Sequence, residues 1–386
     1  MEVRDRVRAF LDEHDPSAMS RTEFLGARFD AGLAWVHFPQ GLGGLGASRE
    51  QQGVVEQLLA GTPGPDGRQG IGLGMAAPTI LAFGTEEQKK RYLRPLWTGE
   101  EIWCQLFSEP GAGSDLAGLA TRAVRDGDDW IVDGQKVWTS GAHYADWAIL
   151  VTRTDPDVPK HQGLTYFICD MHAGGVEVRP LRQITGEAEF NEVFLTGVRL
   201  GDELRLGKVG EGWRVAQTTL MNERVAIGGG RTERGGGIIA PVLQTWRDHP
   251  ELRTHDLHRR LLSLWVEAEA TRLAGARLRE QLTAGVPGPE GSAIKLAFSK
   301  LNQELSGLEV ELRREDGLTY GDWTFRRSDE VAMFSRDAGY RYLRAKGNSI
   351  EGGTSEILRN IVSERVLGLP QEQRADKDVP WKDLPR

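Results

Sequence analysis

Helical spacing of apolar residues marks both ends of this 386-residue chain. Residues from 1 to about 102 form short helical runs broken by glycine loops, including one from Glu86 to Trp97 that starts near Thr85. From about 205 onward three longer runs follow, and the second carries apolar residues at i, i+3, i+4 and i+7 over several turns. These runs are VAQTTLMNERVAI, LHRRLLSLWVEAEATRLAGARLREQLTA and GSAIKLAFSKLNQELSGLEVELRRE.

The middle of the chain, from about 103 to 204, follows a different pattern. Short runs rich in Val, Ile, Trp, Tyr and Thr are separated by glycine- and proline-containing turns, which is typical of an antiparallel β domain. They are WIVDGQKVWTS, WAILVTRT, LTYFICDM and VEVRPL. Within the first run, Asp133-Gly134 predicts a tight hairpin. Helices, strands and again helices in succession indicate an α+β fold rather than a doubly wound sheet.

These changes of pattern predict three domains. An N-terminal helical domain covers residues 1–102, a β domain covers 103–204, and a C-terminal helical domain covers 205–386. The last domain ends in the polar tail QEQRADKDVPWKDLPR, which we expect to be loose because chain ends order poorly unless they are tied down.

Composition excludes several classes of protein. The mean hydropathy is −0.41, and no apolar run reaches the roughly 18 residues that a membrane span needs. The N-terminus lacks the apolar segment of a signal peptide, and Cys104 and Cys169 cannot form a disulfide framework, so we expect a cytoplasmic protein. A net charge of −8 without a basic stripe argues against nucleic acid as the main partner. His255 and His258 lack further residues at ligand spacing, so no metal site is predicted.

Glycine supplies 48 of the 386 residues, about 12% where about 7% is usual, so many turns must be tight. The string Gly41–Gly46 matches G-x-G-x-x-G, but a dinucleotide site needs a strand directly before it and an acidic residue about 20 positions later, at the end of a second strand. Here Pro39 intervenes, and Asp66 lies inside the loop Pro63–Gly67. A purely structural loop is therefore the preferred interpretation.

Two motifs in the β region combine groups that can bind a flat polar ligand. Phe107–Asp115 reads FSEPGAGSD, and its backbone N–H groups and hydroxyls can hold an anionic or planar ligand, or simply form a tight interdomain turn. About twenty residues later, Lys136–Gly141 reads KVWTSG. Its indole can stack on a ring while the hydroxyls bond the ring edge, or it can be a core tryptophan. The two motifs together, at this spacing, indicate a ligand site more specifically than either motif alone.

A third motif lies near the C-terminus, where Ser349–Glu356 reads SIEGGTSE and precedes the helical run ILRNIVSERVLGL. A Gly-Gly-Thr turn at a helix start presents N–H groups to a phosphate or carbonyl oxygen. The alternative is a glycine-rich helix entry capped by Thr354 or Ser355.

Together, the segments S-E-P-G-A-G-S-D, K-V-W-T-S, N-E-R-V-A-I-G and G-G-T-S-E-I-L-R-N, in this order and at this spacing, resemble the acyl-CoA dehydrogenase family over nearly the whole chain. The resemblance implies a helical domain, a central antiparallel β domain and a C-terminal helical bundle. It also implies FAD at a subunit interface, oxidation of an acyl-CoA thioester to the trans-2-enoyl product, and electron-transferring flavoprotein as the usual electron acceptor.

The resemblance also assigns roles residue by residue. Gln105–Ser114 match the loop that lines the flavin and the start of the substrate channel, with Ser114 near the CoA moiety. Trp138 matches the tryptophan packed on the flavin, and Ser140 the hydroxyl residue that bonds flavin N5. Gly353–Glu356 match a turn that touches FAD near the thioester. The implied cofactor-binding residues are Gln105, Phe107, Ser108, Gly113, Ser114, Trp138, Thr139, Ser140, Gly353, Thr354, Ser355 and Glu356.

The reaction needs a carboxylate that takes a weakly acidic α-proton, in an apolar pocket that raises its pKa. Many family members carry this glutamate directly before Gly-Thr, where this chain has Gly352, and Glu351 is one residue off. Isovaleryl- and long-chain-type members carry it on the helix after the β domain, before an arginine. The resemblance therefore assigns Glu223 as the base and Arg224 as a substrate-positioning residue, with Gly352 orienting the carbonyl; a solvated Glu–Arg surface pair is the alternative.

Two family motifs for the far end of FAD are missing. The R-x-x-F-G loop is replaced by the segment 231–237, RTERGGG, and the Q-x-x-G-G-x-G stretch by GLEVELRREDGLTYGDW. The resemblance therefore implies either a homodimer or homotetramer that binds FAD with substitute residues, or a heterotetramer with a second dehydrogenase chain. A catalytically silent partner subunit is the alternative of a different class, and flavin monooxygenation or nitroalkane oxidation on the same fold is a third.

Overall fold

The computed structural model describes residues 2–228, 232–283, 288–321, 323–327, 336–374 and 376–385, with the backbone alone for 224–228 and 282–283. The chain divides into two compact units, each described by itself below. Unit 1 comprises Met1–Leu181, Glu189–Thr219 and Arg374–Arg386, and unit 2 comprises Arg182–Ala188 and Leu220–Gln373. The predicted domain limits at 102 and 204 stay a prediction.

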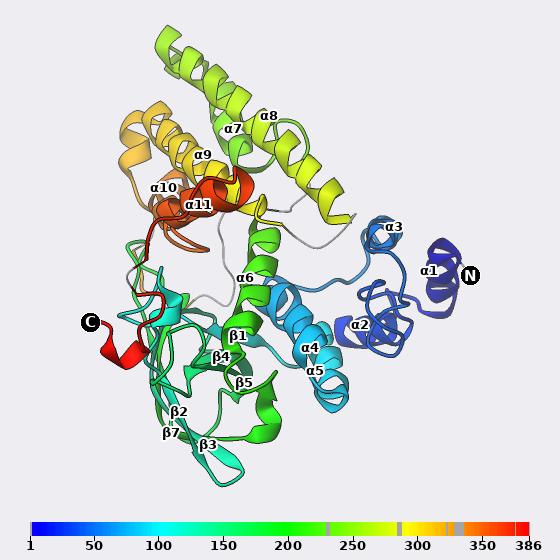
Figure 1. The fold of residues 1–386 in the computed structure, drawn as a ribbon. Coiled ribbons are helices and arrows are strands. Elements are labelled where there is room, and N and C mark those ends of the chain that lie inside the picture. The colour runs from blue at the N-terminus through cyan, green and yellow to red at the C-terminus, as the bar shows by residue number, and fades with distance from the viewer. Residues whose placement is uncertain are drawn as a thin grey trace. The chain divides into compact units, whose positions relative to one another are not determined.

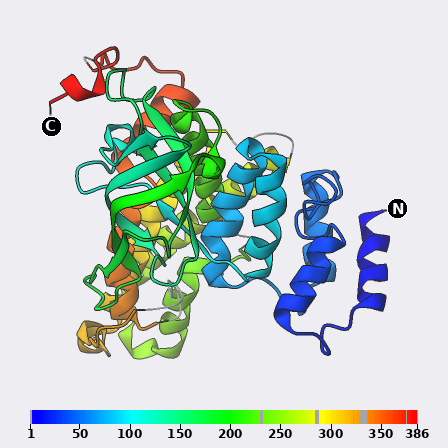
Figure 2. The ribbon, with the colours of Figure 1, turned by 90° about the horizontal axis from the view of Figure 1, so that it is seen from below.

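Helices open unit 1, as the apolar spacing predicted. They are α1 (Val3–Glu13), α2 (Arg21–Asp30), α3 (Gln52–Leu58), α4 (Ala77–Phe83) and α5 (Glu86–Thr98), with a π-helical turn over Gly72–Ala76. The Thr85 side chain caps the start of α5 in a reciprocal capping box with Gln88, and Gly99 ends the helix in the left-handed conformation, with φ 77°. Both views show α4 and α5 beside the sheet of this unit (Figures 1 and 2).

The glycine string of the N-terminal region is a packed loop, as the sequence interpretation favoured. A Cβ on Gly43 would lie 2.6 Å from the ring of Phe29, and one on Gly44 would lie 2.1 Å from the carbonyl oxygen of Phe38. The glycines therefore allow close backbone packing, and no strand leads into the string.

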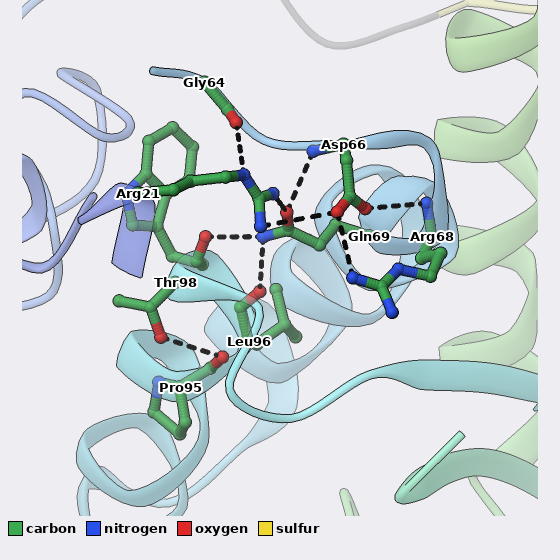
Figure 3. A network of polar contacts seen from close by, with 9 residues as sticks. Arg21, Gly64, Asp66, Arg68, Gln69, Pro95, Leu96 and Thr98 are labelled. Atoms are coloured by element: carbon green, nitrogen blue, oxygen red, sulfur yellow. Dashed lines mark hydrogen bonds and ion pairs between the residues drawn. The ribbon is translucent and has the colours of Figure 1, made fainter. Parts of the chain in front are cut away.

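Asp66, the acidic residue of the rejected nucleotide motif, belongs to a local network (Figure 3). Its carboxylate accepts a hydrogen bond from the backbone N–H of Arg68 at 3.0 Å and forms an ion pair with Arg21 at 3.3 Å. Buried Gln69 donates to the carbonyl oxygen of Trp97 at 2.7 Å and accepts from Arg21. The network joins the loop before α4 to the end of α5. Asp66 itself caps the short helical turn Gly67–Gln69.

A mixed sheet forms the rest of unit 1. Its hydrogen-bonded order is β6-β7-β3-β2-β4-β5-β8, and β1 pairs with β4 in parallel. The strands are β1 (Trp103–Leu106), β2 (Arg122–Asp126), β3 (Asp129–Ser140), β4 (Trp147–Arg153), β5 (Leu164–Asp170), β6 (Val176–Pro180), β7 (Phe190–Gly201) and β8 (Arg205–Leu206). Antiparallel pairs predominate, as predicted, and apolar side chains from these strands form the core.

The hairpin predicted at Asp133-Gly134 is wrong. These residues lie inside β3, and the chain reverses instead between Asp126 and Asp129. Gly134 sits where the β3–β7 register shifts, and a Cβ there would lie 2.3 Å from Thr121 Oγ1. The glycine therefore allows close approach of a neighbouring segment rather than a turn.

Unit 2 is helical in the part of it that the structure describes. Helix α6 (Gly212–Gly228) begins in unit 1 and runs into unit 2, and α7 (Ala240–Asp248), α8 (His255–Thr283), α9 (Gly291–Leu312), α10 (Ala338–Ala345) and α11 (Ser355–Ile361) follow. Apolar residues of α7, α8 and α9 form one core, in which Leu301, Leu305 and Leu308 of α9 recur at helical spacing. In the described residues, no helix has the length and apolar character for crossing a bilayer.

The prediction of a loose C-terminal tail is wrong for residues 376–385. Its last part belongs to unit 1 and lies against the loop between β4 and β5. Pro380 forms a β-bridge with Pro159, and Lys382 forms an ion pair with Asp157 at 2.6 Å. The prediction overlooked Trp381, which supplies an anchor in an otherwise polar segment.

Candidate functional site

The first predicted motif forms the loop that leaves β1. The carbonyl oxygen of Ser108 accepts a hydrogen bond from the backbone N–H of Val137 at 2.9 Å, which ties the loop to β3. Glu109 and Ala112 exchange backbone hydrogen bonds at 3.0 Å each, which closes a tight turn around Pro110 and Gly111. The loop and the second motif are therefore neighbours, as their joint interpretation required.

A buried ion pair fastens the two motifs together. Lys136 Nζ of β3 lies 2.8 Å from Glu109 Oε1 of the loop, with Lys136 0% exposed and Glu109 8%. The same ammonium donates to the carbonyl oxygens of Phe107 at 3.0 Å and Val151 at 2.9 Å. Its hydrogen-bonding capacity is thus satisfied away from water, which a buried charge requires.

The Glu109 carboxylate is equally well satisfied. It accepts from the backbone N–H of Ala120 at 2.6 Å and of Thr121 at 2.9 Å, besides Lys136. Burial alone would raise the pKa of Glu109, but the charge and hydrogen bond of Lys136 with these backbone donors hold its pKa below the ordinary value. Burial lowers the pKa of Lys136, and the charge of Glu109 opposes that shift. The pair holds both ends of the loop.

Trp138 projects from β3 at a bulge. The register between β3 and β7 shifts between Lys136 and Thr139, and Trp138 takes φ 60°, a left-handed conformation that is rare outside glycine. Its indole is 58% exposed and touches Phe190 edge-on, with centroids 5.8 Å apart. This exposure excludes the core tryptophan of the alternative interpretation and leaves a flat aromatic face open.

Two of the predicted cofactor-binding residues carry unsatisfied polar atoms. Gln105 Oε1 and Thr139 Oγ1 are buried and have no hydrogen-bond partner. Ser140, next along β3, is half-buried, and Gly141 follows with φ 66°. Because buried polar groups are normally paired, these atoms are suited to a ligand that brings its own donors. The exposed indole, with Thr139 and Ser140 next to it on β3, fits the face and edge of an isoalloxazine ring.

The end of the loop assigned to CoA is open. Gly113 and Ser114 are exposed, and no atom lies within 4 Å of a Cβ built on Gly113. The next residue, Asp115, forms an ion pair with Lys160 at 2.8 Å. Phe107, at the opposite end, is buried edge-on against Tyr166 with centroids 5.8 Å apart, so its side chain belongs to the core of the unit.

Unit 2 holds the remaining predicted residues, including the Gly-Gly-Thr turn. Gly352 and Gly353 have φ 63° and 93°, and the Thr354 side chain caps α11 by accepting from the N–H of Ile357 at 3.2 Å. Thr354 therefore caps the helix, as the alternative interpretation predicted. Capping by its side chain leaves the backbone of the turn able to bind a ligand. Ser355 is half-buried. Glu356 is exposed and pairs with Arg359 at 3.2 Å on its own helix.

A buried lysine holds this turn. Lys295 of α9 is 1% exposed, and its Nζ donates to the carbonyl oxygens of Asn348 and Gly353 at 2.7 Å each. Burial lowers the pKa of Lys295, while the charges of Glu351 and Glu223 oppose the shift. Both carboxylates that compete for the role of base therefore lie within electrostatic range of one ammonium.

The Glu351 carboxylate is bound by two neighbouring side chains. Arg344 binds its two carboxylate oxygens at 3.1 and 3.0 Å, and Asn348 Nδ2 donates to Oε1 at 2.5 Å. A bidentate guanidinium fixes the orientation of the carboxylate, and both of its oxygens are already engaged. The structure thus gives a reason, besides the offset of one residue, why Glu351 is the poorer base.

Glu223 lies on α6 and is half-buried. The side chain of Arg224 lies outside the described residues. One turn before Glu223 on the same helix, Thr219 is buried and its hydroxyl lies 2.8 Å from Thr79 Oγ1 and 2.9 Å from the Tyr166 hydroxyl. The buried hydroxyl cluster fixes the rotation of α6 just before Glu223.

The sequence interpretation missed Glu109, Lys136 and Lys295 as supports of the site. Glu109 and Lys136 stood inside the recognised motifs, and a lysine within an apolar strand run was the available signal. Lys295 lies in an apolar helix run and carried the same signal. The contacts that give these residues their role join positions far apart in the sequence.

Both cysteines are buried and free. Burial raises the pKa of the Cys104 thiol, and raises that of Cys169 to about 12, so neither is a thiolate nucleophile. Within the described ranges, no group of three or more His, Cys, Asp or Glu side chains is placed to hold a metal.

Three family models match successive parts of the chain. They are described as acyl-CoA dehydrogenase N-terminal domain, middle domain and C-terminal domain, over residues 1–100, 104–198 and 210–367.

Curated relatives agree with these matches. Acyl-CoA dehydrogenase IpdE1 of Mycobacterium tuberculosis is 36% identical over 344 residues, which cover 89% of this chain and 86% of that protein. Acyl-CoA dehydrogenase FadE34 of the same organism is 42% identical over 345 residues, which cover 89% of this chain. The match spans 45% of FadE34, so this chain corresponds to less than half of that protein.

Solved structures show the same fold. The Tcur3481-Tcur3483 steroid ACAD matches with a TM-score of 0.74 and 27% identity, covering 96% of this chain and 97% of that one. The ChsE4-ChsE5 complex from Mycobacterium tuberculosis matches with a TM-score of 0.70 and 26% identity, covering 96% of each chain.

Proposed function

The chain belongs to the acyl-CoA dehydrogenase family, and from this premise we propose that it oxidises an acyl-CoA thioester to the trans-2-enoyl thioester with Glu223 as the α-proton base. Family membership establishes the enzyme class and FAD as the cofactor; a dehydrogenase from Mycobacterium smegmatis with the same fold is described in complex with FADH2. When bound, FAD supplies the acceptor for the hydride that leaves the β-carbon.

The exposed Trp138 carries the proposal. Its left-handed backbone and exposed indole fit a stacked ring, while Ser140 and the unpaired oxygens of Gln105 and Thr139 fit the polar edge of that ring. The remaining cofactor contacts that we propose are those of the family motifs: Phe107, Ser108, Gly113, Ser114, Gly353, Thr354, Ser355 and Glu356.

Glu223 takes the proton from the carbon next to the thioester carbonyl. The rival carboxylate, Glu351, is held by Arg344 and Asn348, which supports the assignment to Glu223. Gly352 and Gly353 present backbone N–H groups in a turn held by Lys295, and such donors stabilise negative charge that develops on a carbonyl oxygen. Arg224 is the proposed positioning residue for the substrate, and Ser114 contacts its CoA part.

The electron acceptor that we propose is electron-transferring flavoprotein, the usual acceptor in the family. A relative at 24% identity is a subunit of a caffeyl-CoA reductase-Etf complex in Acetobacterium woodii, which supports the choice. Reoxidation of the reduced protein by purified electron-transferring flavoprotein, faster than by oxygen, is the expected result. No specific observation favours monooxygenation or nitroalkane oxidation.

We further propose that the working protein contains a second acyl-CoA dehydrogenase chain. Glu309 lies in the stretch where relatives carry the glutamine of the far FAD site, and it is buried and bound by Arg341 at 3.0 Å. FadE34 is more than twice as long as its match to this chain, and two matched structures are two-chain complexes. The partner chain can then supply the missing contacts to the far end of FAD.

The flavin content tests this partner proposal. The chain purified alone is expected to hold well under one FAD per chain, because both family motifs for the far end of FAD are missing. The chain purified by an affinity tag from its own cells, together with its partner, should be yellow and stable to gel filtration. One FAD per chain in a pure homodimer would contradict the proposal. Absorbance at 450 nm against protein concentration is the measurement.

A further inference from the structure

The C-terminal segment 376–385 contacts the loop that follows Ser114. Trp381 lies in the middle of the C-terminal segment, and the backbone N–H of Trp381 donates to the carbonyl oxygen of Val158 at 2.9 Å. Its indole Nε1–H donates to the carbonyl oxygen of Gly118 at 3.0 Å. The segment therefore contacts both the β4–β5 loop and the short turn Leu116–Gly118.

Arg153 links the indole to the rest of that turn. The guanidinium is buried, and its Cζ lies 4.4 Å from the centroid of the Trp381 ring. It donates to the carbonyl oxygens of Leu119 at 3.0 Å and Ala117 at 2.6 Å. A desolvated cation stacks strongly on an indole, so Trp381 stabilises the arginine that binds the turn.

An ionic contact joins the segment to the other end of the turn. Lys160 Nζ lies 2.8 Å from Asp115 Oδ2 and 2.6 Å from Asp376 Oδ2. Lys160 is 6% exposed, so this shared ammonium is largely shielded from water and from salt. The turn is thus held at Asp115 through Asp376 and at Gly118 through Trp381.

We propose that the C-terminal segment positions the substrate loop, holding the turn after Ser114 in the conformation that receives the CoA part of the thioester. The proposal rests on the proposed function, because the family motif assigns Ser114 to CoA. Trp381 and Asp376 are positioning residues that act through Gly118, Arg153 and Lys160. Their effect should fall on CoA binding and leave the flavin and the chemical step unchanged.

Amide hydrogen exchange tests the contact itself. In Trp381→Ala, exchange at Gly118 and Leu119 is expected to accelerate at least about tenfold, because the local opening of the turn loses its outer support. Exchange in β4 should stay unchanged. Lys377→Ala is the matched control, since Lys377 is exposed in the same segment, and it should leave the turn protected.

Binding of desulfo-CoA, measured by calorimetry, tests the consequence. Trp381→Ala should raise its Kd about tenfold, and Trp381→Phe, which keeps the stacked ring, about threefold at most. Asp376→Asn should raise the Kd for desulfo-CoA about threefold. This variant provides the test if Trp381→Ala fails to fold. Flavin content, and the rate of flavin bleaching by an N-acetylcysteamine thioester that lacks the nucleotide, should stay within about twofold of wild type.

The outcomes separate the two proposals. A wild-type protein that binds no desulfo-CoA contradicts the proposed function. A wild-type protein that binds it, with Trp381→Ala and Asp376→Asn binding equally well, contradicts the positioning role alone. Equal weakening by Lys377→Ala, or equal loss of bleaching with the truncated thioester, also overturns the positioning role because the effect would then be general.

Discussion

Replacing Glu223 with glutamine should lower the rate of flavin bleaching by acyl-CoA more than about a hundredfold. Glutamine keeps the size and polarity of the side chain but cannot take the α-proton, so the barrier to forming the enoyl product rises. Flavin content and acyl-CoA binding should remain near those of wild type. Anaerobic stopped-flow absorbance at 450 nm measures the rate, and titration of the flavin spectrum measures binding.

Glu351→Gln is the matched control for this experiment. Its carboxylate is bound by Arg344 and Asn348, so its replacement should lower stability and weaken the turn without abolishing bleaching. An active Glu223→Gln together with an inactive Glu351→Gln would transfer the role of base to Glu351.

Replacing Lys136 with methionine should abolish stable flavin binding and destabilise the protein. The change leaves the buried Glu109 carboxylate without its cation, and breaking a buried pair from one side costs about 3–5 kcal/mol. The loop Phe107–Ala112 then loses its side-chain attachment to the strand that carries Trp138 and keeps the backbone hydrogen bond between Val137 and Ser108. Urea unfolding gives the free energy of unfolding, and absorbance at 450 nm gives the flavin content.

Two further variants make the result specific. Lys208→Met removes an exposed lysine of the same unit and should change neither quantity. The double variant Glu109→Gln/Lys136→Met removes both charges and should recover part of the lost stability, because no unpaired charge stays buried. Full flavin content in Lys136→Met would show that the ion pair does not position the loop.

The fold was predictable because its signals are local and repeated. Helical spacing at both ends, strand-like runs between them and the resemblance of the motifs gave the α+β architecture, which the structure and its neighbours confirm. Local signals failed where a contact over a long sequence distance decided the outcome. Asp133-Gly134 has the composition of a turn, yet Gly134 serves the close approach of Thr121.

For the candidate site, the sequence predicts which motifs belong to it but not the contacts that hold them in place. The sequence predicts Trp138 as a ring-binding residue. The bulge and the φ of 60° that expose its side chain depend on the pairing of β3 with β7, which the sequence of β3 alone does not reveal. The polar composition of the tail predicts a loose segment, but Trp381 stacks on Arg153, a partner from β4 that the sequence of the tail does not reveal. The roles of Glu223, Arg224 and the cofactor-binding residues stay predictions.

The central claim is that this chain removes the α-proton and the β-hydride of an acyl-CoA thioester by means of Glu223. A single anaerobic turnover of the protein purified with its partner tests it most directly, with straight-chain, branched and steroid acyl-CoAs as substrates and mass spectrometry of the products. We expect one trans-2-enoyl-CoA for each flavin bleached with at least one substrate, and none in Glu223→Gln within the same time. Equal enoyl product from Glu223→Gln, or bleaching without any enoyl product, would contradict the account.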